Sequence, residues 1–312
     1  MARDDDDVGV IRVPHEGPWT MTPWSDPATF ATRMTVCIVG WELVRFVFVL
    51  ASRAIIVGGK DDDVKVIARV RLETPKHLTG CVHAIVTATM SAWMLRDASA
   101  LTNPMDCYFT RGPGVGLPND ARDRMEFTNF MFGGYLLSDL AHILARFPKL
   151  GGVDAAFHHA VFASCSLLAG SSQSMMLPFA WLLLGEVSTP LLTVRWALKS
   201  MAYSLKSEKI ISVARFVGFK RVTSIEDAEK RLEVVNVALL AVTFFFVRVV
   251  VYNLGFAHML WASYTGLLDP VPRYVVLTFN ALVGFGSLLN AYWFYVITSK
   301  ALQKFFKGKK KV

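Results

Sequence analysis

Seven long apolar runs separated by short polar segments constrain this chain more than any other feature of its sequence. A helix needs about 20 largely apolar residues to cross a bilayer, with a range of about 17–25. The sequence therefore predicts an all-α integral membrane protein with about seven transmembrane helices. The predicted spans are Val36–Val57, Leu78–Leu95, Phe127–Leu144, Ala155–Gly170, Met175–Trp196, Val234–Phe256 and Val275–Thr298. The fourth is short by this standard, so it either extends beyond these bounds or is shielded by its neighbours.

Composition agrees with a membrane protein and leaves little room for other domains. Of 312 residues, 53% are hydrophobic and 19% are charged, against about 25% charged in an average soluble domain. The length suffices for one helical bundle with short connections. We divide the chain into a polar N-terminal segment (1–35), a first transmembrane helix with its loop (36–74), a larger helical domain (75–306) and a basic tail (307–312).

The net charge of +8 does not indicate a nucleic-acid partner, because the Lys and Arg residues border the apolar runs. Cytosolic segments of membrane proteins carry an excess of Lys and Arg. With the N-terminus outside the cytosol, 21 of these residues fall in cytosolic segments and 8 on the opposite side. This distribution predicts an odd number of spans and a cytosolic C-terminus.

One cytosolic segment, Ser207–Arg221, has a helical apolar face bordered by basic residues. The apolar residues are Ile210, Ile211, Ala214 and Val217. Such a segment either lies as a helix on the anionic cytosolic leaflet or serves as a solvated connector.

The tail KGKKKV places Lys309 and Lys310 at the fourth and third positions from the end. This spacing is typical of a dilysine retrieval signal and predicts the endoplasmic reticulum membrane, with another endomembrane or the plasma membrane as the alternative. Ordinary positive-inside charge explains the same residues without a signal.

Polar and ionisable side chains are numerous inside the predicted spans. Each ionisable group there costs about 2.5–3.5 kcal/mol on insertion scales, so it needs a partner, water or a function. Five lie near the cytosolic end on three helices, namely His83, Asp139, His142, His158 and His159. Deeper in the membrane lie Glu186, Arg248 and Asn290. Glu42 and Arg45 are three residues apart on the first span, where we expect them to pair with each other.

Local geometry refines two of these positions. Adjacent helical residues point about 100° apart, so His158 and His159 cannot face one ligand equally. One is expected to face the bundle interior and the other a neighbouring helix or the boundary. Pro190 removes a backbone donor, which predicts a kink and a freed carbonyl near Glu186.

The histidine cluster suits proton transfer or nucleophilic attack, since imidazole titrates near neutrality and Asp139 can orient a ring nitrogen. A metal site is disfavoured because no His-x-x-x-His spacing exists and the ligands would have to come from several helices. Interhelical hydrogen bonding that only holds the bundle together is the remaining alternative.

Six runs of residues resemble the TLC domain, the family of the TRAM translocon proteins, the ceramide synthases and smaller TLC-domain-containing proteins. They are CVHAIV (81–86), GYLLSDL (134–140), FHHAVF (157–162), LGEVSTPLLTVRW (184–196), FFVRVV (245–250) and NAYWFYVI (290–297). The resemblance covers roughly residues 75–306. It implies six helices around a central cavity, a preceding first helix, a lipid ligand and residence in the endoplasmic reticulum.

In ceramide synthases the histidine pair opens a motif that acylates a sphingoid base from acyl-CoA. The resemblance therefore implies His158 or His159 as acyl acceptor or base, with Asp139 nearby to orient it. It implies no bound cofactor, only acyl-CoA as a co-substrate. The expected lipid-binding side chains are His83, Tyr135, His142, Glu186, Ser188, Arg195, Arg248 and Asn290.

The chain departs from ceramide synthases in the fifth span. Those enzymes carry a His-Asp pair and a further Asp in the window that here reads Gly185-Glu186-Val187-Ser188-Thr189. The second histidine is absent, Thr189 stands in place of the last aspartate, and only Glu186 retains a carboxylate. The sequence is more similar to the smaller TLC-domain-containing proteins.

Three functions follow as hypotheses. The first is a lipid-handling protein that binds a ceramide, fatty acyl chain or phospholipid and affects membrane lipid composition. The second is an acyl-CoA-dependent acyltransferase, and the third is a non-catalytic translocon-associated or escort protein. Membrane lipids are the expected partners in the first two, and the sequence leaves open whether copies form a homo-oligomer.

Overall fold

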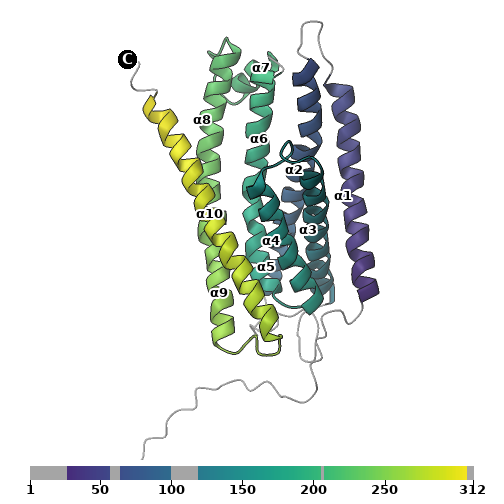
Figure 1. Ribbon diagram of the computed structural model, residues 1–312. Coiled ribbons are helices and arrows are strands. Elements are labelled where there is room, and N and C mark those ends of the chain that lie inside the picture. Colours follow the sequence, from purple (N-terminus) through teal and green to yellow (C-terminus); the bar gives the residue numbers. More distant parts are fainter. Residues whose placement is uncertain (1–26, 57–63, 100–118, 205–206, 308–312) are drawn as a thin grey trace, which may run out of the picture.

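The computed structural model describes residues 27–56, 64–99, 119–204 and 207–307, and within these ranges the chain is helical with short turns and no strand (Figure 1). The helices of the first half are α1 (Pro27–Ile55), α2 (Val64–Ser99), α3 (Asn119–Ala145) and α4 (Val153–Ser172). The second half contains α5 (Met176–Leu183), η2 (Leu184–Ser188), α6 (Thr189–Lys199), η3 (Ser200–Ser204), α7 (Lys209–Phe216), α8 (Ile225–Phe244), η4 (Phe245–Val251), α9 (Tyr252–Tyr264) and α10 (Arg273–Lys307). Lys309, Lys310 and most of the N-terminal segment lie outside the described residues.

Long helices run side by side (Figure 1). We call each of them a rod: α1, α2, α3, α4, the run from α5 to α6, the run from α8 to α9, and α10. Each predicted span overlaps one rod. Helices long and apolar enough to cross a membrane occupy Ala28–Ile55, Val64–Ser99, Met176–Ala202, Ile225–Tyr264 and Arg273–Leu302. These confirm five of the predicted crossings as suitable helices. The rods at the third and fourth predicted positions, α3 and α4, do not reach this apolarity.

The polar character of α3 and α4 has a structural explanation. Most side chains of α3 from Thr128 to Asp139 are buried by neighbouring helices rather than turned outward. Asn129 of α3 donates to the carbonyl of Ser166 in α4 at 3.1 Å, and the Ser166 hydroxyl donates back to the Asn129 carbonyl at 3.0 Å. Helix α4 has 20 residues, which at about 1.5 Å per residue is close to the thickness of the hydrocarbon core. The polar side chains of α3 and α4 are thus hydrogen-bonded between helices, so these two rods need fewer apolar residues than helices that face lipid.

Apart from α1, the rods contact one another in sequence around a ring that returns to its starting helix. Helix α2 packs on α3, α3 on α4, α4 on α10, α10 on α9, α9 on α5, and α5 and α6 on α2. Helix α1 packs against α2 and α3 from outside this ring. The shared core contains large buried side chains from most rods, including Phe132, Phe162, Phe179, Tyr252 and Phe279.

The rod formed by α5 and α6 changes its winding just before Pro190. Residues Leu184–Ser188 form a 3₁₀ turn, in which the Thr189 amide donates to the carbonyl of Glu186. The carbonyl of Gly185 is left without its usual helical donor, because a helical Thr189 would have used it. This freed acceptor is one residue from the predicted position, and Arg248 occupies it at 3.0 Å.

The segment Ser207–Arg221 contains the short helix α7, whose apolar face is only partly outward. Ile210 and Ala214 are fully buried and pack with Leu198 of α6 and Leu232 of α8. Phe216 is instead 92% exposed. The predicted helix exists, but half of its apolar face contacts protein rather than lipid or solvent.

Small residues permit the closest contacts between rods. A Cβ atom on Gly255 of α9 would lie 2.4 Å from the Cβ of Trp181 in α5. A Cβ atom on Gly40 of α1 would meet nothing within 4 Å. A larger side chain at Gly255 would therefore have to displace Trp181, whereas one at Gly40 would displace no described atom.

We expect Gly255→Leu to lower the melting temperature of the purified protein in detergent, because overpacking costs about 1–3 kcal/mol. Gly40→Leu is the matched control and should leave the melting temperature unchanged. Equal melting of the two variants would contradict the tight α5–α9 contact.

Candidate functional site

Asp139 of α3 lies at the centre of a buried charge cluster formed by three helices. Its side chain is 1% exposed, and its Oδ1 accepts from Nη2 of Arg45 in α1 at 2.7 Å. Its Oδ2 lies 3.1 Å from Nε2 of His159 in α4. The expected pairing of Arg45 with Glu42 is wrong, because Arg45 reaches across to α3 instead.

The two adjacent histidines face different surroundings, as the 100° rule predicts. Nδ1 of His159 donates to the carbonyl of Ala155 at 2.8 Å, so both ring nitrogens of His159 are engaged. The ring of His158 packs against Phe162 at 4.6 Å and Trp293 at 5.1 Å between centroids. Its Nδ1 is buried and has no hydrogen-bond partner among the described residues.

His83 is buried in an aromatic stack rather than open to a ligand. It is 2% exposed, and its ring stacks on Tyr135 at 3.7 Å with the planes 12° apart. Trp41 of α1 contacts both rings from the side, with centroids 5.4 and 5.5 Å away. The ring centroids of Tyr135 and His159 are 6.2 Å apart. The side chains of Trp41, His83, Tyr135 and His159 therefore form one continuous layer, which we call the histidine layer.

A second buried cluster connects the 3₁₀ turn η2 with the widened turn η4. Nη2 of Arg248 lies 3.0 Å from Oε1 of Glu186, with side chains 8% and 13% exposed. Arg248 also donates to the carbonyl of Gly185, the hydroxyl of Ser188 at 3.0 Å and the hydroxyl of Thr189 at 3.2 Å. Thr189 in turn donates to Oε2 of Glu186 at 2.8 Å. Both carboxylate oxygens of Glu186 are therefore occupied.

Two predicted site residues lie apart from these clusters. His142 approaches Glu42 at 3.0 Å, and both side chains are about one-third exposed or more. Ser138 donates to the same carboxylate. Arg195 lies 3.6 Å from Glu233 on α8, toward the end of the rods where α7 packs.

Asn290 of α10 belongs near the histidine layer. It is 1% exposed, and its Nδ2 has no hydrogen-bond partner among the described residues. One turn before it, a Cβ atom on Gly286 would meet the hydroxyl of Tyr252 and the ring of Phe162 in α4, and three residues after it the ring of Trp293 packs on His158. Residues three and four apart share a helix face, so Asn290 lies on the face of α10 turned toward α4.

Metal binding finds no support in the geometry. Within the described ranges no three His, Cys, Asp or Glu side chains are grouped so as to hold a metal ion. The contacts of Trp41, Trp293 and Arg45 had no signal in sequence spacing, because each joins helices distant along the chain.

The fold and the clusters define a multi-pass membrane protein in which buried charged side chains connect separate helices. The chain belongs to the TLC-domain family (TRAM, LAG1 and CLN8), whose sequence model matches residues 73–299. This match starts in α2 and ends in α10, so Arg45 and Trp41 of α1 lie outside it. No curated protein and no solved structure gives a significant match.

We expect the buried Glu186–Arg248 pair to show strong coupling. Removing one partner of a buried ion pair costs about 3–5 kcal/mol, because the other charge is left uncompensated. Glu186→Gln and Arg248→Met should each lower the melting temperature and the monodisperse yield in detergent. The double variant should lose much less melting temperature than the two single variants lose when their losses are added, because neither charge is then left unpaired.

The control for this cycle is the exposed pair Arg231–Asp227, whose side chains are 49% and 38% exposed. Surface pairs contribute little, so Arg231→Gln should leave melting unchanged. Additive losses at Glu186 and Arg248 would show that the two side chains do not act as a pair.

Proposed function

We propose that the chain is a lipid-handling membrane protein that binds the polar end of an acyl lipid where α4 meets α10. The family is broadly linked to lipid handling. The observation that carries the proposal is the pair of buried, unpartnered polar atoms at this contact, Nδ1 of His158 and Nδ2 of Asn290. Buried polar groups are nearly always hydrogen-bonded, so an unfilled pair calls for a ligand or water.

The chemistry of the two side chains indicates the kind of lipid. The Asn290 amide nitrogen only donates, and an imidazole nitrogen donates or accepts according to its tautomer. A ceramide amide, a fatty acyl carboxyl group or a phospholipid ester supplies the matching acceptors and, for ceramide, hydroxyl and amide donors. The exposed rings of Phe157 and Phe285 lie 4.7 Å apart beside this contact and offer apolar surface for an acyl chain.

In this proposal all seven rods cross the bilayer, the lipid lies at the α4–α10 contact, and the C-terminus is in the cytosol. Support comes from the ring of helix contacts and from the excess of Lys and Arg at one end. The proposed compartment is the endoplasmic reticulum, as expected from the resemblance to the TLC-domain family. Binding there would affect membrane lipid composition by retaining or presenting one lipid class.

We expect lipid that copurifies with the wild-type protein to decrease several-fold in His158→Phe and in Asn290→Leu, because each removes one hydrogen-bonding group of the site. Lipid would be identified and counted by mass spectrometry of detergent-purified protein. His258→Phe on α9 is the matched control, since this half-buried imidazole packs on Trp261 away from the α4–α10 contact. Lipid content that is equal in all four proteins would reject the site.

Acyl transfer is the second candidate function, favoured by the unpartnered Nδ1 of His158. That nitrogen would attack the thioester carbon of acyl-CoA, and the CoA thiolate would leave. An amine acceptor would then take the acyl group, its proton passing to the thiolate. Glu186 does not help this reaction, because Arg248 and Thr189 occupy its carboxylate.

Lipid binding without chemistry predicts that wild-type protein given radiolabelled palmitoyl-CoA and sphinganine forms no labelled amide. Amide that forms with wild type and is lost in His158→Ala or His159→Ala would establish the acyltransferase instead. The escort hypothesis differs from both, since it predicts a crosslinked protein partner and no bound lipid.

A further inference from the structure

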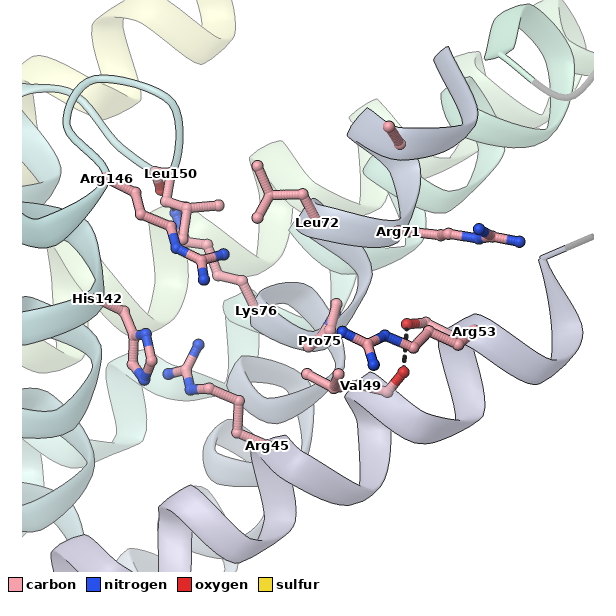
Figure 2. A pocket seen from close by; sticks show the side chains of 12 residues that line it. Arg45, Val49, Arg53, Arg71, Leu72, Pro75, Lys76, His142, Arg146 and Leu150 are labelled. Carbon is pink, nitrogen blue, oxygen red and sulfur yellow. Dashed lines mark hydrogen bonds between the residues drawn. The ribbon is translucent and has the colours of Figure 1, made fainter. Parts of the chain in front are cut away.

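A pocket of about 450 Å³ lies at the ends of α1, α2 and α3, away from the α4–α10 contact (Figure 2). Its volume is within the usual range of small-ligand sites. The basic side chains that line it are Arg45, Arg53, Arg71, Lys76, His142 and Arg146. None of its described lining residues is acidic.

Most of this positive charge is not neutralised within the described chain. Arg45 pairs with Asp139 and His142 with Glu42, but Arg71 and Lys76 donate only to the backbone carbonyls of Ile56 and Leu150. Arg53 and Arg146 make no ion pair with any described residue. Four cations thus line one pocket without a carboxylate partner, although the head group of Arg71 is directed away from it toward the Ile56 carbonyl (Figure 2).

The arrangement of the head groups fits one compact anion. Figure 2 shows Arg45, His142 and Arg146 directed toward the pocket from one side and Arg53 approaching from the other. They come from α1, α3 and the turn after α3, whereas Lys76 comes from α2. Arginine forks bind phosphate oxygens in pairs, and a phosphate offers enough oxygens for several helices at once. A carboxylate, with two oxygens, would leave most of these donors unused.

In the proposed topology the pocket lies near the cytosolic membrane surface. It lies at the same end of the rods as α7 and the C-terminal end of α10 (Figure 1). This is the end that carries the excess of Lys and Arg, and basic residues near an anionic leaflet are attracted to it.

We propose that this pocket binds a phosphate group, carried either by an anionic lipid of the adjacent leaflet or by a soluble phosphate compound. Basic residues that only flank a membrane helix extend freely into solvent. Arg45, Arg71 and Lys76 differ from these, because hydrogen bonds hold their side chains in place. The site includes Arg45 and Arg53 of α1, which precede the residues matched by the TLC-domain family. It does not depend on the lipid site at His158.

The test uses the full chain in nanodiscs and the double variant Arg53→Gln/Arg146→Gln. Both side chains are exposed and unpaired within the described ranges, so the variant should fold. The control is Lys149→Gln/Lys220→Gln, which removes two exposed charges that do not line the pocket. One arm counts phosphatidic acid retained from phosphatidylcholine nanodiscs by native mass spectrometry. The other titrates inorganic pyrophosphate into phosphatidylcholine nanodiscs by calorimetry.

We expect binding to the wild type and the Lys control and a loss of at least about tenfold in the Arg variant, as two charged hydrogen-bonding groups are removed. Loss in the phosphatidic acid arm identifies a lipid headgroup, and loss in the pyrophosphate arm alone identifies a soluble ligand. Absence of binding to the wild type in both arms, or an equal loss in the Lys control, would overturn the proposal. Lipid bound at His158 and Asn290 should be unchanged in the Arg variant, so the two sites are tested separately.

Discussion

The cost of a charge in the hydrocarbon core governs the structure of this protein. A buried ionisable group in lipid must find a partner within the protein, because no water is present to solvate it. Asp139 and Arg248 are nearly inaccessible, and each is held by groups from other rods. These ion pairs fix how the rods face one another in a medium where apolar side chains gain little from mutual contact.

The same constraint explains which features could be predicted from the sequence. Apolar runs mark the rods because each rod must satisfy its own backbone, so the positions of the helices were predictable. The direction of His158 and His159 followed from helix geometry alone. The partner of Arg45 did not, because spacing along one helix indicates Glu42 and carries no information on α3. The packing of Ile210 and Ala214 was missed for the same reason, since an amphipathic face does not show whether lipid or protein covers it.

Helix α1 contributes more to the site than the limits of the family match suggest. The match begins at residue 73, yet Arg45 supplies the cation for Asp139 and Trp41 closes the stack of His83 on Tyr135. Without α1, Asp139 would keep only His159 as an ionisable side chain within ion-pair distance. The layer is therefore built by α1 together with α2, α3 and α4, rather than by the matched domain alone.

The two buried clusters differ in what they leave unfilled, and this difference favours binding over catalysis by the fifth span. Arg248 and both oxygens of Glu186 are occupied by each other and by Gly185, Ser188 and Thr189. A carboxylate so engaged would have to break a buried ion pair before it could accept a proton, which costs several kcal/mol. On its α10 side the histidine layer leaves Nδ1 of His158 and Nδ2 of Asn290 without a partner among the described residues. A ligand that completes those two groups gains hydrogen bonds without breaking any, which is why we propose the lipid site at the α4–α10 contact.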